Sequence, residues 1–264
     1  CELVRGGFAY FLDKINGKPN TYINPDLGEF IYQYSDDLPF VFALIFFYIG
    51  FRLIHQRDFI TLISPDSRFS WSLFFKGFAW VLILVIIESI YLIFGSSDYQ
   101  FSLNQNFIIL ALGSLFLVSL QTSVEEIVFR GYLLQGLNLI FKIPIIAVLI
   151  TSILFSLAHS LGSESYLEYG PTFLISALIL GIFLADITLI TDRLELAMGI
   201  HAANNLYDTL ISSKNIPENI SLFLYNERNP YLVLLATFLA VILFLLIFYR
   251  YQISRLSILF KKLS

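Results

Sequence analysis

Long apolar runs separated by short polar segments dominate the chain. Seven runs approach the length of about 20 residues that a helix needs to cross a bilayer, at residues 38–54, 71–94, 107–137, 143–159, 171–190, 194–212 and 231–251. The runs are continuous rather than alternating, which argues against a transmembrane barrel. Because lipid cannot satisfy open backbone groups, the pattern predicts an all-α, polytopic integral membrane bundle with about seven visible transmembrane helices.

The apolar runs follow a polar N-terminal segment, residues 1–37, which carries turn signals such as Asn16-Gly17 and Asn24-Pro25. No long polar linker follows, so we expect residues 38–264 to form one membrane-embedded domain. The chain begins with Cys1 rather than Met. We therefore expect a fragment or a processed product, from which an upstream helix has been removed.

Basic residues alternate between the connections of the predicted helices. The first, third and fifth connections carry Arg52, Arg57 and Arg68, then Lys142, then Arg193, whereas the second and fourth carry no Lys or Arg. The C-terminal tail is also basic. Because basic loops stay in the cytoplasm, this alternation predicts that the odd-numbered loops and the C-terminus are cytoplasmic.

The composition narrows the class of protein. Hydrophobic residues make up 57% and charged residues 14%, against about 45–50% and about 25% in soluble domains. The net charge is −4 without a basic block, which excludes nucleic acid as a partner and leaves membrane lipids. One cysteine excludes an intrachain disulfide, and with three histidines any metal site must be sparse.

Ionisable residues within the third apolar run are the first candidate for function. Adjacent Glu125 and Glu126 are costly in lipid. Glu126 and Arg130 are four residues apart, so they share a helix face and can pair. Glu125 points elsewhere and is free to accept a proton. The alternative is a helix that ends early and leaves the whole group solvated at the interface.

Two further polar groups interrupt later runs. Phe155 and His159 are four residues apart, as are His201 and Asn205. Gly199 and its small neighbours permit close approach of another helix. The alternatives are an interfacial histidine in the first group and an interhelical hydrogen bond that only holds the bundle together in the second.

The three groups in this order, Glu-Glu-x-x-x-Arg, Phe-x-x-x-His and His-x-x-x-Asn, resemble the CAAX prenyl protease and bacteriocin-processing family of intramembrane proteases, also called the CPBP, Abi or type II CAAX family. The resemblance is good over residues 105–210, the motif core. It implies an eight-helix type of bundle, whose first helix would be missing here. It also implies a protein of the bacterial plasma membrane that cleaves peptides near the membrane, in a cavity that opens to the cytoplasm.

The resemblance also implies roles for individual residues. Glu125 would activate the attacking water and His159 would orient it, while His201 and Asn205 would stabilise the oxyanion. Glu126, Arg130 and Phe155 would be supporting residues. The substrate would be a peptide or a lipidated peptide, and the motifs indicate no oligomeric state.

Metal dependence stays open at this point. Glu125, His159 and His201 could hold Zn²⁺ with one position left for water. A metal-free glutamate mechanism uses the same residues. Asn205 is an unusual zinc ligand and suits an oxyanion hole better, which favours the metal-free version.

Two other functions compete with proteolysis. A non-catalytic scaffold or bacteriocin self-immunity protein of the same fold would keep the helices without the reaction. An ion-coupled transporter would use Glu125, Glu88 or Asp186 in an ion path. Depth counting adds a difficulty, because it places Glu125 and His201 in the cytoplasmic half and His159 about 20 Å or more from that side.

Overall fold

The computed structural model describes residues 38–95, 100–101, 105–160, 170–212, 223–224 and 230–248, so the predicted segment 1–37 lies outside the described residues. Apart from two paired strands, β1 (Gln100–Phe101) and β2 (Phe223–Leu224), the described elements are helical. The helices are α3 (Leu38–His55), η1 (Phe59–Leu62), α4 (Trp71–Gly95), α5 (Gln105–Glu126), η2 (Ile127–Leu134), α6 (Gln135–Phe141), α7 (Pro144–Ala158), α9 (Pro171–Thr191), α10 (Glu195–Tyr207), η3 (Asp208–Ser212) and α11 (Pro230–Phe248).

Each of the seven predicted apolar runs forms a helical rod. The third rod consists of α5, the π-helical segment η2 and α6, which follow one another without a break. It ends at Lys142, whose φ of 57° stops the helix, and Pro144 then opens α7 at a position where a missing N–H costs nothing. The all-helical part of the fold prediction is therefore confirmed.

Apolar side chains cover much of the outer surface. Phe46 and Leu53 on α3 and Trp71 and Phe75 on α4 are all exposed. Among the described residues, two stretches are long and apolar enough to cross a membrane, Ala111–Phe141 and Pro171–Thr191. Soluble proteins rarely expose apolar surface on this scale, so these faces favour contact with lipid.

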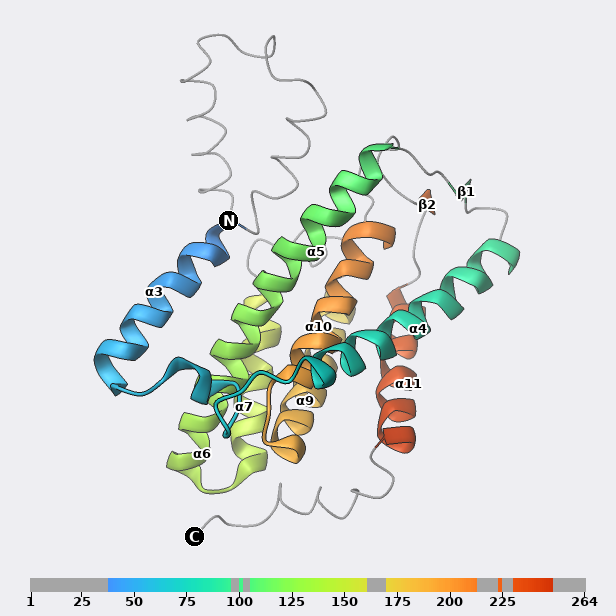
Figure 1. Ribbon diagram of the computed structural model, residues 1–264. Coiled ribbons are helices and arrows are strands. Elements are labelled where there is room, and N and C mark those ends of the chain that lie inside the picture. The colour runs from blue at the N-terminus through green and yellow to red at the C-terminus, as the bar shows by residue number, and fades with distance from the viewer. Residues whose placement is uncertain are drawn as a thin grey trace.

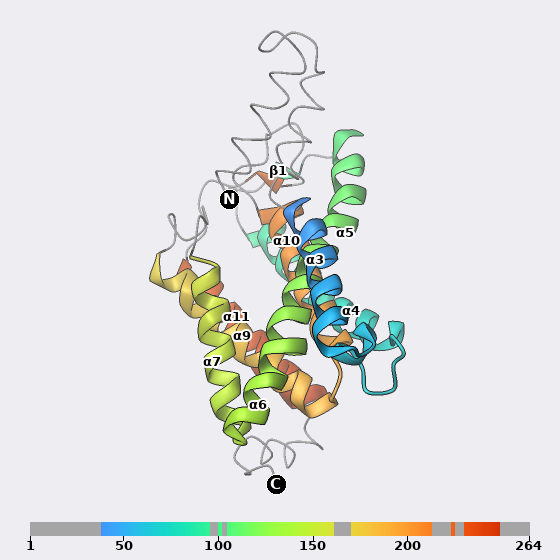
Figure 2. The same cartoon turned by 90° about the vertical axis from the view of Figure 1, so that its left-hand side faces the viewer.

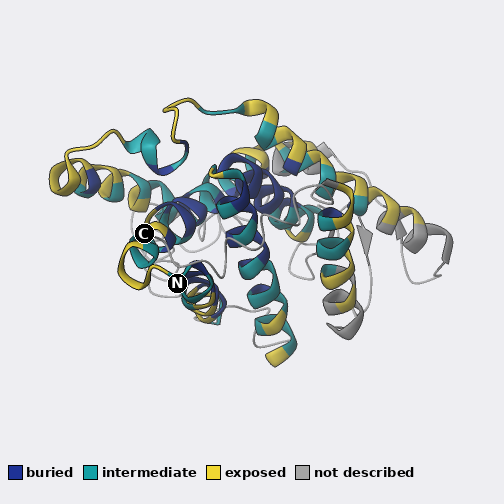
Figure 3. Ribbon diagram, turned by 90° about the horizontal axis from the view of Figure 1, so that it is seen from below, coloured by how far each residue is buried: buried dark blue, intermediate teal, exposed yellow. Residues whose placement is uncertain are grey.

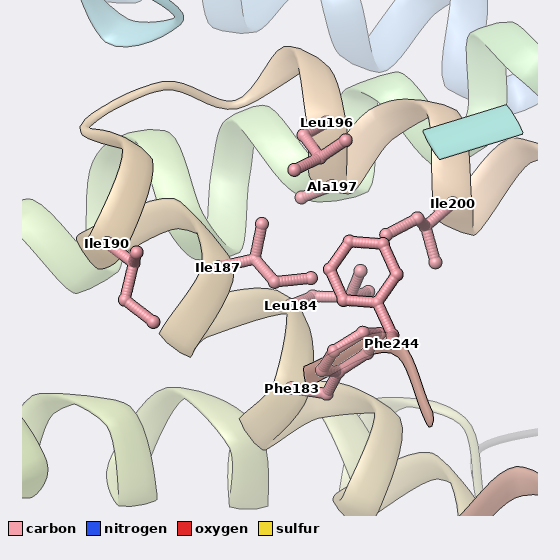
Figure 4. Packing of buried hydrophobic residues seen from close by; sticks show 8 residues of the cluster. All are labelled: Phe183, Leu184, Ile187, Ile190, Leu196, Ala197, Ile200 and Phe244. Carbon is pink, nitrogen blue, oxygen red and sulfur yellow. The ribbon is translucent and has the colours of Figure 1, made fainter. Parts of the chain in front are cut away.

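The buried core lies where α4, α9, α10 and α11 meet. Figure 4 shows one cluster of eight buried side chains, Phe183, Leu184, Ile187, Ile190, Leu196, Ala197, Ile200 and Phe244. In Figure 1, α5 and α10 run through the middle of the bundle, and Figure 2 shows α7 and α9 on the opposite side from α3 and α4. Buried residues gather at this centre, and exposed residues mark the outer helices (Figure 3).

A close crossing of α4 and α10 fixes the position of α10, the helix that carries His201. A Cβ added at Gly199 would overlap the carbonyl oxygen of Phe74, and one added at Gly77 would overlap the carbonyl oxygen of Leu196. Only glycine allows the two backbones to approach this closely. The expected close approach at Gly199 is confirmed.

Gly199→Ala is therefore expected to lower the free energy of unfolding by about 1–3 kcal/mol or more, because the methyl group meets backbone that cannot rotate away. Gly136→Ala is the matched control, since nothing lies within 4 Å of a Cβ added there. Because alanine is favoured over glycine in a helix, Gly136→Ala should raise the free energy of unfolding by about 0.5–1 kcal/mol. Denaturation in detergent micelles measures both variants, and equal stabilities would contradict the close crossing.

A cluster of hydrogen bonds ties the loop after α3 to the turn before α10. Arg193 Nη1 pairs with Asp66 Oδ2 at 3.0 Å, and Nη2 donates to the carbonyl of Arg68 at 2.7 Å and to Glu195 Oε1 at 2.9 Å. Ser64 also donates to Asp66. The bonds from Arg193 and Ser64 hold the pKa of Asp66 well below its usual range, and Glu195 and Asp66 raise the pKa of Arg193.

Glu195 links the starts of two helices. It is fully buried, it is the first residue of α10, and its Oε1 accepts the backbone N–H of Ser70 at 2.8 Å, one residue before α4 begins. The N-terminal ends of both helices carry partial positive charge, which stabilises a carboxylate there. The backbone N–H of Leu194 donates to Ile63 O at 3.0 Å and completes the attachment. The loop after α3 thus sets where α10 begins.

The bond to Asp66 predicts a pH-dependent stability. Because folding lowers the pKa of Asp66, its carboxylate stabilises the fold above the usual value of 3.8 and loses this effect as the pH falls below it. Asp66→Asn should therefore lower the melting temperature at neutral pH, and its difference from the wild type should narrow below pH 3.8. Asp192→Asn, an exposed change in the neighbouring turn, is the control. A difference that does not vary with pH would count against the ion pair.

Candidate active site

Three different helices bring the predicted site residues together. Glu125 and Glu126 close α5, and Arg130 lies in the π-helical segment that follows. His159 caps the C-terminal end of α7, and His201 lies in the middle of α10. π-Helical turns are rare and frequently accompany functional sites.

Glu125, His159 and His201 form a compact triad. Glu125 Oε2 lies 3.9 Å from His159 Nε2 and 3.7 Å from His201 Nε2. One ligand atom of each residue lies within 4.8 Å of the other two. His201 is 1% exposed, Glu125 11% and His159 25%, so His159 forms the accessible side of the triad.

The other ring nitrogen of each histidine is already engaged. His159 Nδ1 lies 2.8 Å from the carbonyl oxygen of Phe155, and His201 Nδ1 lies 2.7 Å from Glu126 Oε1. Both oxygens act as acceptors here, because a carbonyl cannot donate and Glu126 is paired with Arg130. Each Nδ1 therefore donates, which leaves Nε2 of both rings facing Glu125.

Glu126 and Arg130 form the buried support beneath the triad. Arg130 Nη1 lies 2.7 Å from Glu126 Oε1, and the two side chains are 1% and 0% exposed. Nη2 donates to Gly181 O on α9 at 3.2 Å, and the guanidinium lies 4.3 Å from the ring centroid of Phe155 on α7. The expected ion pair is present, and it links the helices that carry Glu125, His159 and His201.

Phe155 contacts both Arg130 of the support and His159 of the triad. Its ring centroid lies 4.3 Å from that of His159 and 5.6 Å from that of His201, and the side chain is fully buried. Its ring also packs on the guanidinium of Arg130 in the fully buried pair. Charges in such a dry environment interact more strongly than they do in water.

The lengths of the rods explain how Glu125 and His159 come to the same depth. The third rod extends to Phe141, which places Glu125 about 24 Å from its end. The 15 residues of α7 place His159 about 22 Å from the start of that helix. The two rods are joined at Lys142, so both residues reach the same level.

Comparison with known proteins identifies a family and a relative of this chain. Residues 104–207, which contain all three motifs, match the family described as type II CAAX prenyl endopeptidase Rce1-like. An uncharacterized protein of Bacillus subtilis (strain 168), YyaK, is 31% identical over 245 residues, covering 86% of this chain and 80% of its own length. The chain belongs to the Rce1-like family. No solved structure matches it.

Membership of the Rce1-like family confirms the resemblance drawn from the three motifs. The family and the apolar helices together indicate a membrane protein with a CAAX-type protease fold. YyaK is itself uncharacterized, so it adds no activity to the family description.

The remaining predicted residues have different surroundings. Asn205 follows His201 by one turn of α10, is half-buried, and accepts a hydrogen bond from Asn204 Nδ2 on its own Oδ1 at 3.4 Å. Its Nδ2 is left to serve as a donor. Asp186 lies on α9, and its buried Oδ1 has no hydrogen-bond partner among the described residues. The side chain of Glu88 lies outside the described residues.

Gln121 is a site residue that the motifs did not reveal. Its Nε2 donates to Glu125 Oε1 at 3.3 Å from one turn earlier on α5. The four-residue spacing was visible in the sequence, but many polar residues share such a spacing with a neighbour. Only the triad on the other side of Glu125 makes this contact informative.

The donor set of the triad fits a metal ion. Glu125 Oε2 and His201 Nε2 are buried without a hydrogen-bond partner among the described residues. Two imidazoles and one carboxylate are preferred ligands of Zn²⁺, and ligand atoms around a tetrahedral zinc ion lie about 3.4 Å apart. Glu125 Oε2 lies 3.7 and 3.9 Å from the two Nε2 atoms and all three ligand atoms lie within 4.8 Å of one another, so zinc binding would draw them closer together. Zinc-binding histidines typically donate a hydrogen bond to an oxygen from the ring nitrogen that does not bind the metal, and both Nδ1 atoms have such a partner here.

Proposed function

We propose that this chain is an intramembrane endopeptidase of the CAAX prenyl protease and bacteriocin-processing type. A water molecule activated at Glu125 would hydrolyse a peptide bond near the membrane. The observation that carries the proposal is the convergence of Glu125, His159 and His201 from three helices. Polar atoms such as Glu125 Oε2 and His201 Nε2 are costly to bury in a membrane protein without hydrogen-bond partners. A purely structural role would not explain that cost.

The triad suits the handling of water. Glu125 Oε2 is an acceptor at the centre of the group, and it would take a proton as the water oxygen attacks the carbonyl carbon of the substrate. His159, on the accessible side, would hold the second hydrogen of the water. The proton on Glu125 would then pass to the leaving amine as the C–N bond breaks, so that the carboxylate is restored.

The developing oxyanion needs hydrogen-bond donors. Asn205 Nδ2 would supply one, because its Oδ1 is already bonded to Asn204. His201 can donate through Nε2 only as an imidazolium, since its Nδ1 proton is committed to Glu126. Donors of this kind contribute about 3–4 kcal/mol to comparable acyl-transfer reactions.

A bound metal would change the assignment of His201. Glu125, His159 and His201 would hold Zn²⁺, which would polarise the substrate carbonyl and lower the pKa of bound water. In that version His201 is a neutral ligand, whereas the metal-free version needs it as a cation. The protonation state of His201 therefore separates the two versions.

All seven rods are proposed to cross the plasma membrane of a bacterial cell, with the basic loops in the cytoplasm. A cytoplasmic opening then requires a polar path of about 22 Å, because His159 and Lys142 lie at opposite ends of α7. Labelling of single cysteines, introduced after Cys1 is replaced by Ser, tests the orientation. A membrane-impermeant reagent should modify Ser160→Cys on intact cells and Lys142→Cys only after permeabilisation, and the reverse would overturn it.

The function itself is tested on purified protein in detergent. We expect cleavage of at least one peptide in a panel with matched prenylated and unprenylated members, located by mass spectrometry. A chelator titration with elemental analysis accompanies the assay. Full activity in a metal-free sample would exclude the zinc version, and loss that Zn²⁺ restores would exclude the metal-free one. An inactive wild type across the panel would favour the non-catalytic scaffold.

A further inference from the structure

Gln121 contacts the acid of the triad from outside the three motifs. Its Nε2 lies 3.3 Å from Glu125 Oε1, and both residues are on the same face of α5. A carboxylate oxygen only accepts, so the amide must turn its NH₂ group toward Glu125. The contact therefore has one orientation.

The two oxygens of Glu125 have separate surroundings. Oε1 accepts from Gln121, whereas Oε2 faces His159 and His201 and is buried without a hydrogen-bond partner among the described residues. A glutamate side chain rotates about three bonds, so its carboxylate plane is not fixed by the backbone. The Gln121 bond to one oxygen restricts this rotation and keeps the other oxygen on the side of the two imidazoles.

We propose that Gln121 is a positioning residue, which holds Glu125 so that Oε2 points at the two imidazoles. This inference rests on the proposed function only for its effect on turnover. Neighbouring Glu126 is fixed by both Arg130 and His201, each at 2.7 Å. The Gln121 contact gives Glu125 the corresponding constraint on its other side.

Gln121→Met tests the proposal, because it keeps the length of the side chain and removes the donor. Loss of a hydrogen bond to a charged group corresponds to a decrease in kcat of about tenfold to a hundredfold. KM should stay within about twofold, since Gln121 holds the acid rather than the substrate. Gln121→Glu has nearly the shape of the original, also removes the amide donor, and replaces Gln121→Met if that variant does not fold.

Gln135→Met is the matched control. Gln135 is in the same rod and donates to Leu62 O at 3.3 Å, the same length as the Gln121 bond, but it is away from the triad. Its kcat should stay within about twofold of the wild type. Gel filtration and melting temperature establish that all variants are folded.

Infrared spectroscopy gives a readout that does not need a substrate. Subtracting the spectrum of Glu125→Gln isolates the carboxylate band of Glu125, which should shift in Gln121→Met and stay unchanged in Gln135→Met. If the band shifts in Gln121→Met but the wild type cleaves no peptide, the positioning role is supported and the proposed function is contradicted. Active wild type with an unchanged band and unchanged kcat in Gln121→Met would overturn the positioning role.

Discussion

Glu125→Gln is expected to abolish peptide cleavage while leaving the protein folded. The amide has the shape of the carboxylate but cannot accept the proton of the attacking water. General-base catalysis contributes about 10²–10⁴-fold, and we expect kcat to fall by that factor. The measurement is cleavage of the best peptide from the panel, with gel filtration to show that the variant is monodisperse.

The control for this experiment is Asp192→Asn, which makes the same chemical change at an exposed turn residue. It should keep kcat within about twofold of the wild type. If Glu125→Gln retains more than about a tenth of the activity, the assignment of the base is wrong. His159 would then be the next candidate, because it is the more exposed member of the triad.

Arg130→Met is expected to have the largest effect on stability. The change leaves Glu126 fully buried with an uncompensated negative charge. Removing one partner of a buried pair costs about 3–5 kcal/mol, more than the pair itself contributes. The cation–π contact with Phe155 and the bond to Gly181 O are lost as well. Chemical denaturation in micelles measures the free energy of unfolding.

Arg52→Met is the matched control for Arg130. Arg52 pairs with Asp58 at 2.6 Å, close to the 2.7 Å of the buried pair. The side chains of Arg52 and Asp58 are, however, 43% and 75% exposed. An exposed pair contributes about 0–1 kcal/mol. The double variant Arg130→Met with Glu126→Gln should recover part of the loss, because it removes the unpaired charge. Equal losses for Arg52→Met and Arg130→Met would contradict the burial argument.

The helices could be predicted because their signal is local. Each apolar run is long, and Pro144 and Pro171 stand at the start of their helices, where proline is well tolerated. The four-residue spacing of Glu126 and Arg130 likewise fixes a shared face within one helix. The third run was predicted over residues 107–137, whereas the rod extends from Gln105 to Phe141, and this longer C-terminal end sets the level of Glu125.

Contacts between helices required the folded structure. His201 Nδ1 meets Glu126 across 75 positions of sequence, and Arg193 meets Asp66 across 127. Nothing in the order of residues states these distances, because they depend on how α10 crosses α4 and α5. Gln121 shows the same limit within one helix, since its contact gains meaning only from the histidines beyond Glu125.

By itself, the sequence determined the helical rods, the costly polar residues within them and the family to which their order points. Periodicity and the cost of burying charge act within a single segment, so they can be read from it. The tertiary structure alone decided that Glu125, His159 and His201 share one small space, and that both imidazoles turn Nε2 toward it. These features depend on glycine-mediated crossing, rod length and a buried ion pair, which act between segments.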